Sequence, residues 1–268
     1  MKLYIKAISS YRSDEESLDI KKELKSKYKL DTRRQDAFIH LSVFGAQRLK
    51  ESAEINSDDE LFLTSGVGNI DVIARTNMAV VEKGEFIKPF DFINMLGNTT
   101  SYYVATSLGV QGKNIFDISD SFPVTNSLIL IYASLFNSKK EALFGSIDLI
   151  GDSEELIRRV MGLEIDTPVV SSVNYQKLSI DDTKALAALE FDTNYYTRDE
   201  VFKIVNENKQ RKICSSLRCK ELGFLTNDKF FATDASYFIN QSIEKKEDIL
   251  YIDFFEDRYK ILKVSMLS

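Results

Sequence analysis

The sequence predicts an α/β fold with a partly parallel sheet, on three observations. Short apolar or alternating segments, typical of strands, take turns along the chain with longer segments whose apolar residues recur at helical spacing. Hydrophobic residues make up 44% of the 268 residues, which is enough for one large core. Only 3 residues are proline and 11 are glycine, so we expect no long disordered linker.

The first third of the chain alternates strands with helices. We predict strands over residues 3–8 and 60–65, and helices over 14–27, 33–49 and 70–82. Gly66-Val-Gly-Asn is a turn between the second strand and the third helix. We interpret this turn as a point of close packing, because a lone Gly-x-Gly is weak evidence for a phosphate site.

The middle of the chain continues the same alternation. We predict a loop and then a helix over 91–108, ended by Gly109 as its C-cap, and strands over 115–119 and 141–150. Residues 127–136 are so apolar that we expect a helix buried on all sides. Residues 182–191 fit a strand or a helix equally well.

The last part of the chain returns to a clear pattern. Residues 198–208 and 233–245 have helical spacing, and residues 248–255 and 259–266 read as two strands that flank a polar turn. We therefore expect the chain to close on a β-hairpin.

Composition and counting exclude several functions. The net charge is −6 with no basic block, so we expect no nucleic-acid partner. The longest apolar run, 128–135, is too short to cross a membrane, and the N-terminus lacks a signal peptide's apolar core, so we expect a cytoplasmic protein. Cys214 and Cys219 do not form a zinc set, and we expect them to be reduced and structural, with no metal and no cofactor bound. His40 is the single histidine, which excludes any mechanism that needs two.

Several segments, collinear along the chain, carry a resemblance to a known family. They are the arginine-led segment 33–38, the strand and glycine turn 61–70, the segment 89–114, the strand 141–148 and the closing hairpin 248–264. Together they resemble the N-terminal half of the β-ketoacyl synthase family, which has the thiolase-like fold. The resemblance implies a layered α-β-α architecture. Residues 1–192 would be the synthase-like N-terminal half, and residues 193–268 a shortened C-terminal half that completes the same domain.

The family's chemistry depends on a cysteine thiolate at a sharp strand-to-helix turn, where the helix N-terminus lowers its pKa and backbone N–H groups form an oxyanion hole. The resemblance places this turn at Ser121, Phe122, Pro123 and Val124. Depending on the gap chosen, Phe122 or Val124 takes the place of the cysteine, and neither side chain can form a thioester. Residues 41–268 contain no histidine. We therefore expect no catalytic residue in this chain.

The resemblance implies a chain-length-factor type of subunit that pairs with an active β-ketoacyl synthase, as in type II polyketide, aryl-polyene or related pigment pathways. The partner would supply the cysteine and histidines and would receive the acyl carrier protein. Tyr102, Tyr103, Phe116 and Phe122 are candidates for the interface or the acyl tunnel, because aromatic anchors concentrate in interfaces; core packing is the equal alternative.

A different class of function is an acyltransferase or thioesterase-like enzyme on the same fold. Ser121 would be its nucleophile, and its base would have to be a lysine or a carboxylate. A stand-alone module that binds an acyl group or a carrier is a weaker third reading.

Overall fold

The N-terminal part of the chain builds five strands and the helices that cover them. The computed structural model describes residues 1–138 and 140–267. The strands are β1 (Lys2–Arg12), β2 (Glu60–Ser65), β3 (Asn114–Ile118), β4 (Ala142–Asp148) and β5 (Ser172–Ser179). The helices are α1 (Ile20–Ser26), α2 (Ala37–Ser52), α3 (Ile70–Asn77), the π-helix η1 (Met78–Glu82), α4 (Pro89–Met95), α5 (Gly97–Leu108), α6 (Pro123–Leu135) and α7 (Glu154–Val160).

The C-terminal part is shorter and uses the same kinds of element. It contains β6 (Ala187–Glu190), α8 (Arg198–Glu207), β7 (Lys212–Ser215), the 3₁₀-helix η2 (Leu217–Leu222), α9 (Asp234–Lys245), β8 (Ile249–Phe255) and β9 (Arg258–Met266). A capping box starts α8, because the Thr197 side chain accepts from the backbone N–H of Glu200 while the Glu200 carboxylate accepts from that of Thr197.

The strands of the described residues form one nine-stranded sheet in the order β3-β2-β4-β5-β1-β6-β9-β8-β7. In the first part, β5 is antiparallel to β1 and β4, while β2 is parallel to β3 and β4. In the second part, β9 is likewise antiparallel to β6 and β8, while β7 is parallel to β8. The order β2-β4-β5-β1 is therefore repeated as β7-β8-β9-β6. The two sets meet where β1 pairs antiparallel with β6, so the fold is an internal duplication that residue identity along the chain does not reveal.

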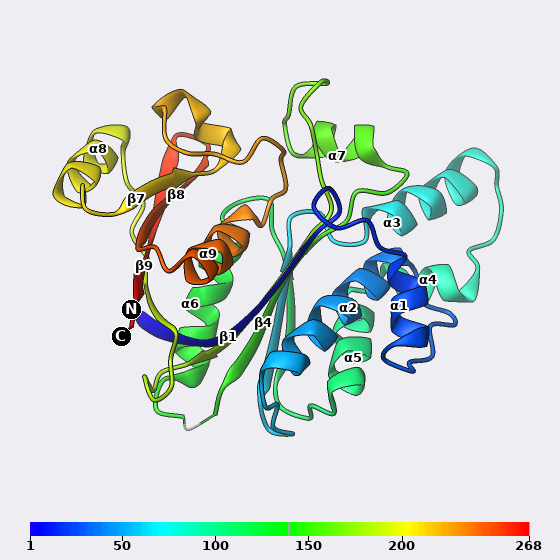
Figure 1. Cartoon of the computed structure of the whole chain (residues 1–268). Coiled ribbons are helices and arrows are strands. Elements are labelled where there is room, and N and C mark those ends of the chain that lie inside the picture. Colours follow the sequence, from blue (N-terminus) through cyan, green and yellow to red (C-terminus); the bar gives the residue numbers. More distant parts are fainter. Residues whose placement is uncertain (139, 268) are drawn as a thin grey trace.

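Three apolar clusters place the helices in layers. The helices α2 and α5 pack on one face of the first set of strands, around Phe38, Phe44 and Tyr175. The helices α6 and α9 lie in the centre, and Figure 1 shows them side by side between the two sets. The helix α8 and η2 cover the outer face of the second set. The central cluster contains residues from both parts of the chain, including Leu3, Phe144 and Leu262, so the two parts share a core.

Most of the predicted elements are confirmed, and the differences have physical reasons. The loop expected from residue 91 is the helix α4, which starts at Pro89, a favoured first helical residue. The helix at 14–27 begins only at Ile20, where the Asp19 side chain caps it. The prediction of a helix buried all round at 127–136 is wrong, since Leu130 on α6 is 45% exposed. The segment 182–191 contains the strand β6.

The sequence patterns missed α7, β5 and β7. Strand β5 is the most instructive, because all eight of its residues are buried although Asn174, Gln176 and Lys177 are polar. Gln176 donates to Asn240 Oδ1 at 2.7 Å, and Lys177 makes an ion pair with Glu141 at 2.7 Å. Tertiary partners satisfy these polar groups, so the strand lies inside without an apolar pattern.

Candidate functional site

The turn before α6 has the sharp geometry that the sequence suggests. Phe122 is its N-cap residue and has φ +49° and ψ +46°, the left-handed region that a bulky side chain rarely adopts. Pro123 follows as the first helical residue. Ser119 Oγ donates to the carbonyl of Ser121 at 3.0 Å, and Asn126 Nδ2 donates to the same carbonyl at 2.9 Å. These hydrogen bonds hold the strained residue in place.

Of the two positions to which the family resemblance assigns the nucleophile, only Phe122 lies at the turn. Val124 lies inside the first turn of α6 and is buried in the central cluster. The Phe122 side chain is 3% exposed, and its ring centroid lies 5.8 Å from that of Tyr195 and 6.3 Å from that of Phe255. Aromatic rings from the C-terminal part of the chain therefore cover the turn.

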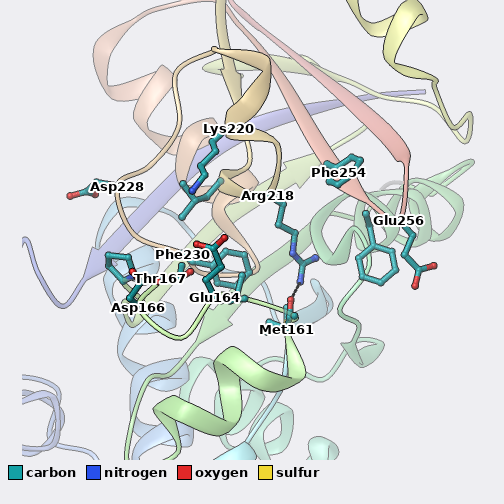
Figure 2. Close-up of a pocket in the computed structure, with 15 residues that line it drawn as sticks. Met161, Glu164, Asp166, Thr167, Arg218, Lys220, Asp228, Phe230, Phe254 and Glu256 are labelled. Atoms are coloured by element: carbon teal, nitrogen blue, oxygen red, sulfur yellow. Dashed lines mark hydrogen bonds between the residues drawn. The ribbon is translucent and has the colours of Figure 1, made fainter.

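A pocket of about 510 Å³ opens beside this turn, and Figure 2 shows its walls. It lies between the segment that follows α7, the 3₁₀-helix η2, and the tip of the β8–β9 hairpin. Its lining includes Phe230, Phe254, Phe255, Arg218 and Lys220, with Glu164, Asp166, Asp228 and Glu256 as the carboxylates. Phe122 is not part of the lining, so Phe255 separates the pocket from the turn.

Arg218 closes the same boundary from the other side. Its guanidinium donates to the carbonyl oxygen of Asp120 at 2.8 Å and to that of Met161 at 3.3 Å. It also lies 5.3 Å from the ring centroid of Phe230 and 5.4 Å from that of Phe255. Arg218 thus ties η2 to the turn before α6 and to the end of α7, next to the pocket (Figure 2).

Three buried carboxylates lie at the ends of strands and at the start of α9. Asp148, at the end of β4, accepts from Gly66 N at 3.1 Å and from both the backbone N–H and the hydroxyl of Thr233 at 2.8 Å. It therefore connects the glycine turn after β2 with α9, and burial raises its pKa. A Cβ on Gly66 would lie 2.2 Å from Ala232, which agrees with the close-packing interpretation of this turn.

The other two buried carboxylates, Asp234 and Asp253, lie near Arg218. Burial raises the pKa of Asp234 well above its usual range, and the nearby charge of Asp253 adds to this effect; Tyr251 donates its hydroxyl hydrogen to Asp234. Burial raises the pKa of Asp253 to about 6, while the positive charge of Arg218 opposes the rise. Among the described residues, no three acidic, cysteine or histidine side chains are placed to bind a metal ion together.

The structure does not bring the four candidate aromatic residues together. Tyr102 is 61% exposed on α5, and Tyr103 is half-buried beside it. Phe116 of β3 stacks on Phe38 with centroids 6.0 Å apart, so it belongs to the cluster around α2. Phe122 lies on the other side of the sheet, with α6.

The hydroxyl of Ser121 has the hydroxyl of Ser119 as its neighbour, at 3.3 Å. No lysine or carboxylate in the described part of the chain hydrogen-bonds to Ser121 Oγ. His40 is distant in the fold: it is buried on α2, its Nε2 lies 3.2 Å from the carbonyl of Thr32, and burial lowers its pKa. Cys214 and Cys219 are both buried and unpaired with each other, as expected for reduced structural cysteines.

Sequence reasoning missed Tyr195, Arg218 and Phe255 as part of this site. They come from three separate segments of the C-terminal part, and no local spacing connects them with the turn before α6. Only Phe255 carried a signal, because it lies in the closing hairpin 248–264, one of the segments that resemble the synthase family.

The duplicated, layered α/β arrangement with a strained turn before a central helix defines a thiolase-like fold. Solved structures with this fold match over the full chain. The ishigamide ketosynthase/chain length factor matches with a TM-score of 0.75, 9% identity, and 100% of both chains covered. A β-ketoacyl synthase from Burkholderia phymatum STM815 matches with a TM-score of 0.67, 11% identity, and 100% of both chains covered. A ketosynthase in complex with its chain length factor from Xenorhabdus doucetiae matches with a TM-score of 0.59, 10% identity, and 98% and 99% covered.

The chain is therefore a structural relative of ketosynthase and chain-length-factor proteins. No protein-family model matches its sequence, and no curated protein matches it. In the described residues, no helix combines the length and the apolar character that crossing a bilayer requires.

Proposed function

We propose that this chain is a non-catalytic, ketosynthase-like subunit of the chain-length-factor type, which pairs with an active β-ketoacyl synthase in fatty-acid or polyketide-like biosynthesis, such as an aryl-polyene or pigment pathway. One observation carries the proposal. The residue at the strained turn before α6, where this fold can expose a nucleophile, is Phe122, and it is buried against Tyr195 and Phe255. A phenyl ring in that position can neither attack a thioester nor leave room for one.

The partner would supply the cysteine and histidines and would receive the acyl carrier protein. This chain would stabilise the partner and help to enclose the growing acyl chain. The solved relatives include a ketosynthase in complex with its chain length factor, which supports a pair of two different subunits. We propose no cofactor for this chain.

Strand β3 is the edge at which we propose the pairing. It is one of the two outermost strands of the sheet, so among the described residues its outer side has no strand neighbour. Such an edge can template pairing with another chain. Exposed apolar residues flank it on both faces: Tyr102 on α5, Ile118 at its own end and Leu130 on α6 are 61%, 47% and 45% exposed.

We also propose that residues 193–268 complete the domain that residues 1–192 begin. The pairing of β6 with both β1 and β9 supports this division of roles, as does the shared central cluster. Among the described residues, no lysine or carboxylate is hydrogen-bonded to Ser121 Oγ, which weighs against the alternative acyltransferase or thioesterase-like function. A covalent acyl adduct on Ser121 would be direct evidence for that alternative function.

The experiment is co-expression with a full-length β-ketoacyl synthase that carries its cysteine and histidines and is encoded next to this chain. We expect the two to co-purify, and the native mass of the complex to equal one or more heterodimers. The isolated chain, incubated with an acyl thioester, should show no added mass on Ser121 or elsewhere. An acyl adduct on the isolated chain that Ser121→Ala removes would refute the proposal.

A further inference from the structure

Nearly half of the exposed large hydrophobic side chains in the described part of the chain belong to one short segment. Of 22 exposed large hydrophobic residues in the described part of the chain, ten lie between residues 70 and 96. This segment contains α3, η1 and α4, and we call it the apolar arm. Val81 is 73% exposed and Phe86 is 97% exposed. Figure 1 shows α3 and α4 at the side of the molecule opposite to α8. An apolar patch of this kind commonly marks an interaction surface.

Polar contacts at its base hold the apolar arm in a defined position. Asn94 is 5% exposed, its Nδ2 donates to the carbonyl of Arg34 at 3.3 Å, and its own carbonyl accepts from Asn69 Nδ2 at 2.9 Å. Arg75 of α3 pairs with Asp91 of α4 at 2.8 Å, which joins the two helices. A surface already fixed in its bound shape loses little conformational entropy on binding.

We propose that the apolar arm docks on the partner ketosynthase subunit, next to the pairing edge at β3. This inference rests on the proposed function, because it names the surface through which the pair is held. Both ends of the apolar arm start beside β3: a Cβ on Gly68 would lie 2.6 Å from Ile118, and a Cβ on Gly97 would lie 2.9 Å from the Phe116 ring. A partner paired along β3 therefore meets the apolar arm as a continuation of the same surface.

The net charge of the apolar arm favours a protein surface over a lipid surface as its binding partner. Residues 70–96 carry four acidic and three basic side chains, a net charge of −1. Helices that lie on membranes through an apolar face typically carry many lysines and arginines on the other face, which attract anionic lipids. The apolar arm lacks that excess, and one of its three basic residues, Arg75, is already paired within the arm.

The test uses the full chain and the ketosynthase that pairs with it. Val81→Glu and Phe86→Glu, alone and together, place carboxylates on the apolar arm where the side chains are exposed, so the fold is kept. Leu225→Glu is the matched control, because Leu225 is 48% exposed and lies against β7 at the opposite edge of the sheet. We expect the double variant to weaken the pair about tenfold or more, since burying an unpaired charge in an interface is costly. The control should leave the dissociation constant unchanged.

Each other outcome is decisive. If the wild-type pair forms and the double variant binds equally well, the docking inference is wrong while the proposed function stands. If no ketosynthase pairs with the wild-type chain, the proposed function fails and the inference falls with it. Two further results would overturn the inference and assign the apolar arm another occupant. If the wild-type chain forms a dimer with itself and the double variant is a monomer, the arm binds a second copy of this chain. If the wild-type chain sediments with phosphatidylcholine–phosphatidylglycerol vesicles and the double variant does not, the arm binds a lipid surface.

Discussion

The guanidinium of Arg218 donates a hydrogen bond to the carbonyl oxygen of Asp120 at 2.8 Å, which joins two segments 98 residues apart. Asp120 lies two residues before Phe122, so this bond connects η2 with the strained turn before α6. Phe255 lies under the Arg218 guanidinium and meets the Phe122 ring edge to face, which adds the β8–β9 hairpin to the same contact. The C-terminal part of the chain thus covers the strained turn before α6.

The first prediction tests that closure with a thiol at the turn. Phe122→Cys should react slowly with iodoacetamide, because Phe255 covers the position, and adding Phe255→Ala should raise the alkylation rate about tenfold or more as exposure increases. Mass spectrometry of tryptic peptides measures the rate at residue 122. The wild-type chain is the control: burial raises the pKa of Cys214 to about 11, and that of Cys219 is raised as well, so both should stay unmodified. Equal rates in the single and double variants would contradict the closed turn.

The second prediction concerns Asp148, which accepts hydrogen bonds from two separate segments. Asp148→Ala leaves the backbone N–H groups of Gly66 and Thr233 buried without a partner, and should lower the free energy of unfolding by about 3–5 kcal/mol. Thr233→Val removes one of these bonds and should cost about 1–3 kcal/mol. Urea unfolding measures both. Asp152→Ala, at an exposed position nearby, should change little. Comparable losses of unfolding free energy in Asp148→Ala and Asp152→Ala would show that the hydrogen bonds of Asp148 to Gly66 and Thr233 do not stabilise the fold.

The third prediction is a pH dependence carried by Asp253. Burial raises its pKa from 3.8 to about 6, so the folded protein holds this proton more tightly than the unfolded chain does. Protonated Asp253 therefore stabilises the folded state by on the order of 2–3 kcal/mol. This contribution is complete below about pH 4 and is lost as the pH rises to about 6. Asp253→Asn should therefore gain stability relative to the wild type between pH 4.5 and 7. Unfolding curves at both pH values measure this difference, and a constant difference would refute the assignment.

The fourth prediction concerns the packing of β4 against β5. A Cβ on Gly145 would lie 2.5 Å from the Tyr175 ring and 2.8 Å from Leu63, so Gly145→Ala should lower the free energy of unfolding by about 1–3 kcal/mol through overpacking. Gly84→Ala is the comparison, because open space surrounds Gly84 and only its φ of +65° opposes a side chain, at a cost of about 1 kcal/mol. Thermal or urea unfolding measures the loss of stability in each variant. Equal losses for Gly145→Ala and Gly84→Ala would contradict the overpacking of Tyr175 and Leu63.

Much of the fold could be predicted because its signals are local. The strand at 60–65, the helix at 70–82 and the closing hairpin follow from apolar spacing and turn residues that lie next to one another in the chain. Strand β5 could not be predicted this way, since Gln176 and Lys177 become buried only when Asn240 and Glu141 reach them from elsewhere. The duplication was also invisible, because it repeats strand order and direction rather than residues.

The sequence by itself determined what this protein lacks: a second histidine is missing from the whole chain, and no cysteine lies near the turn before α6. Counting residues needs no coordinates. Only the tertiary structure decided that Phe122 rather than Val124 is the residue at the turn, and that Tyr195, Arg218 and Phe255 cover it. The reason is physical: a left-handed backbone angle and contacts between segments that are 73 to 133 residues apart arise from the packing of the whole chain, and local sequence carries no record of them.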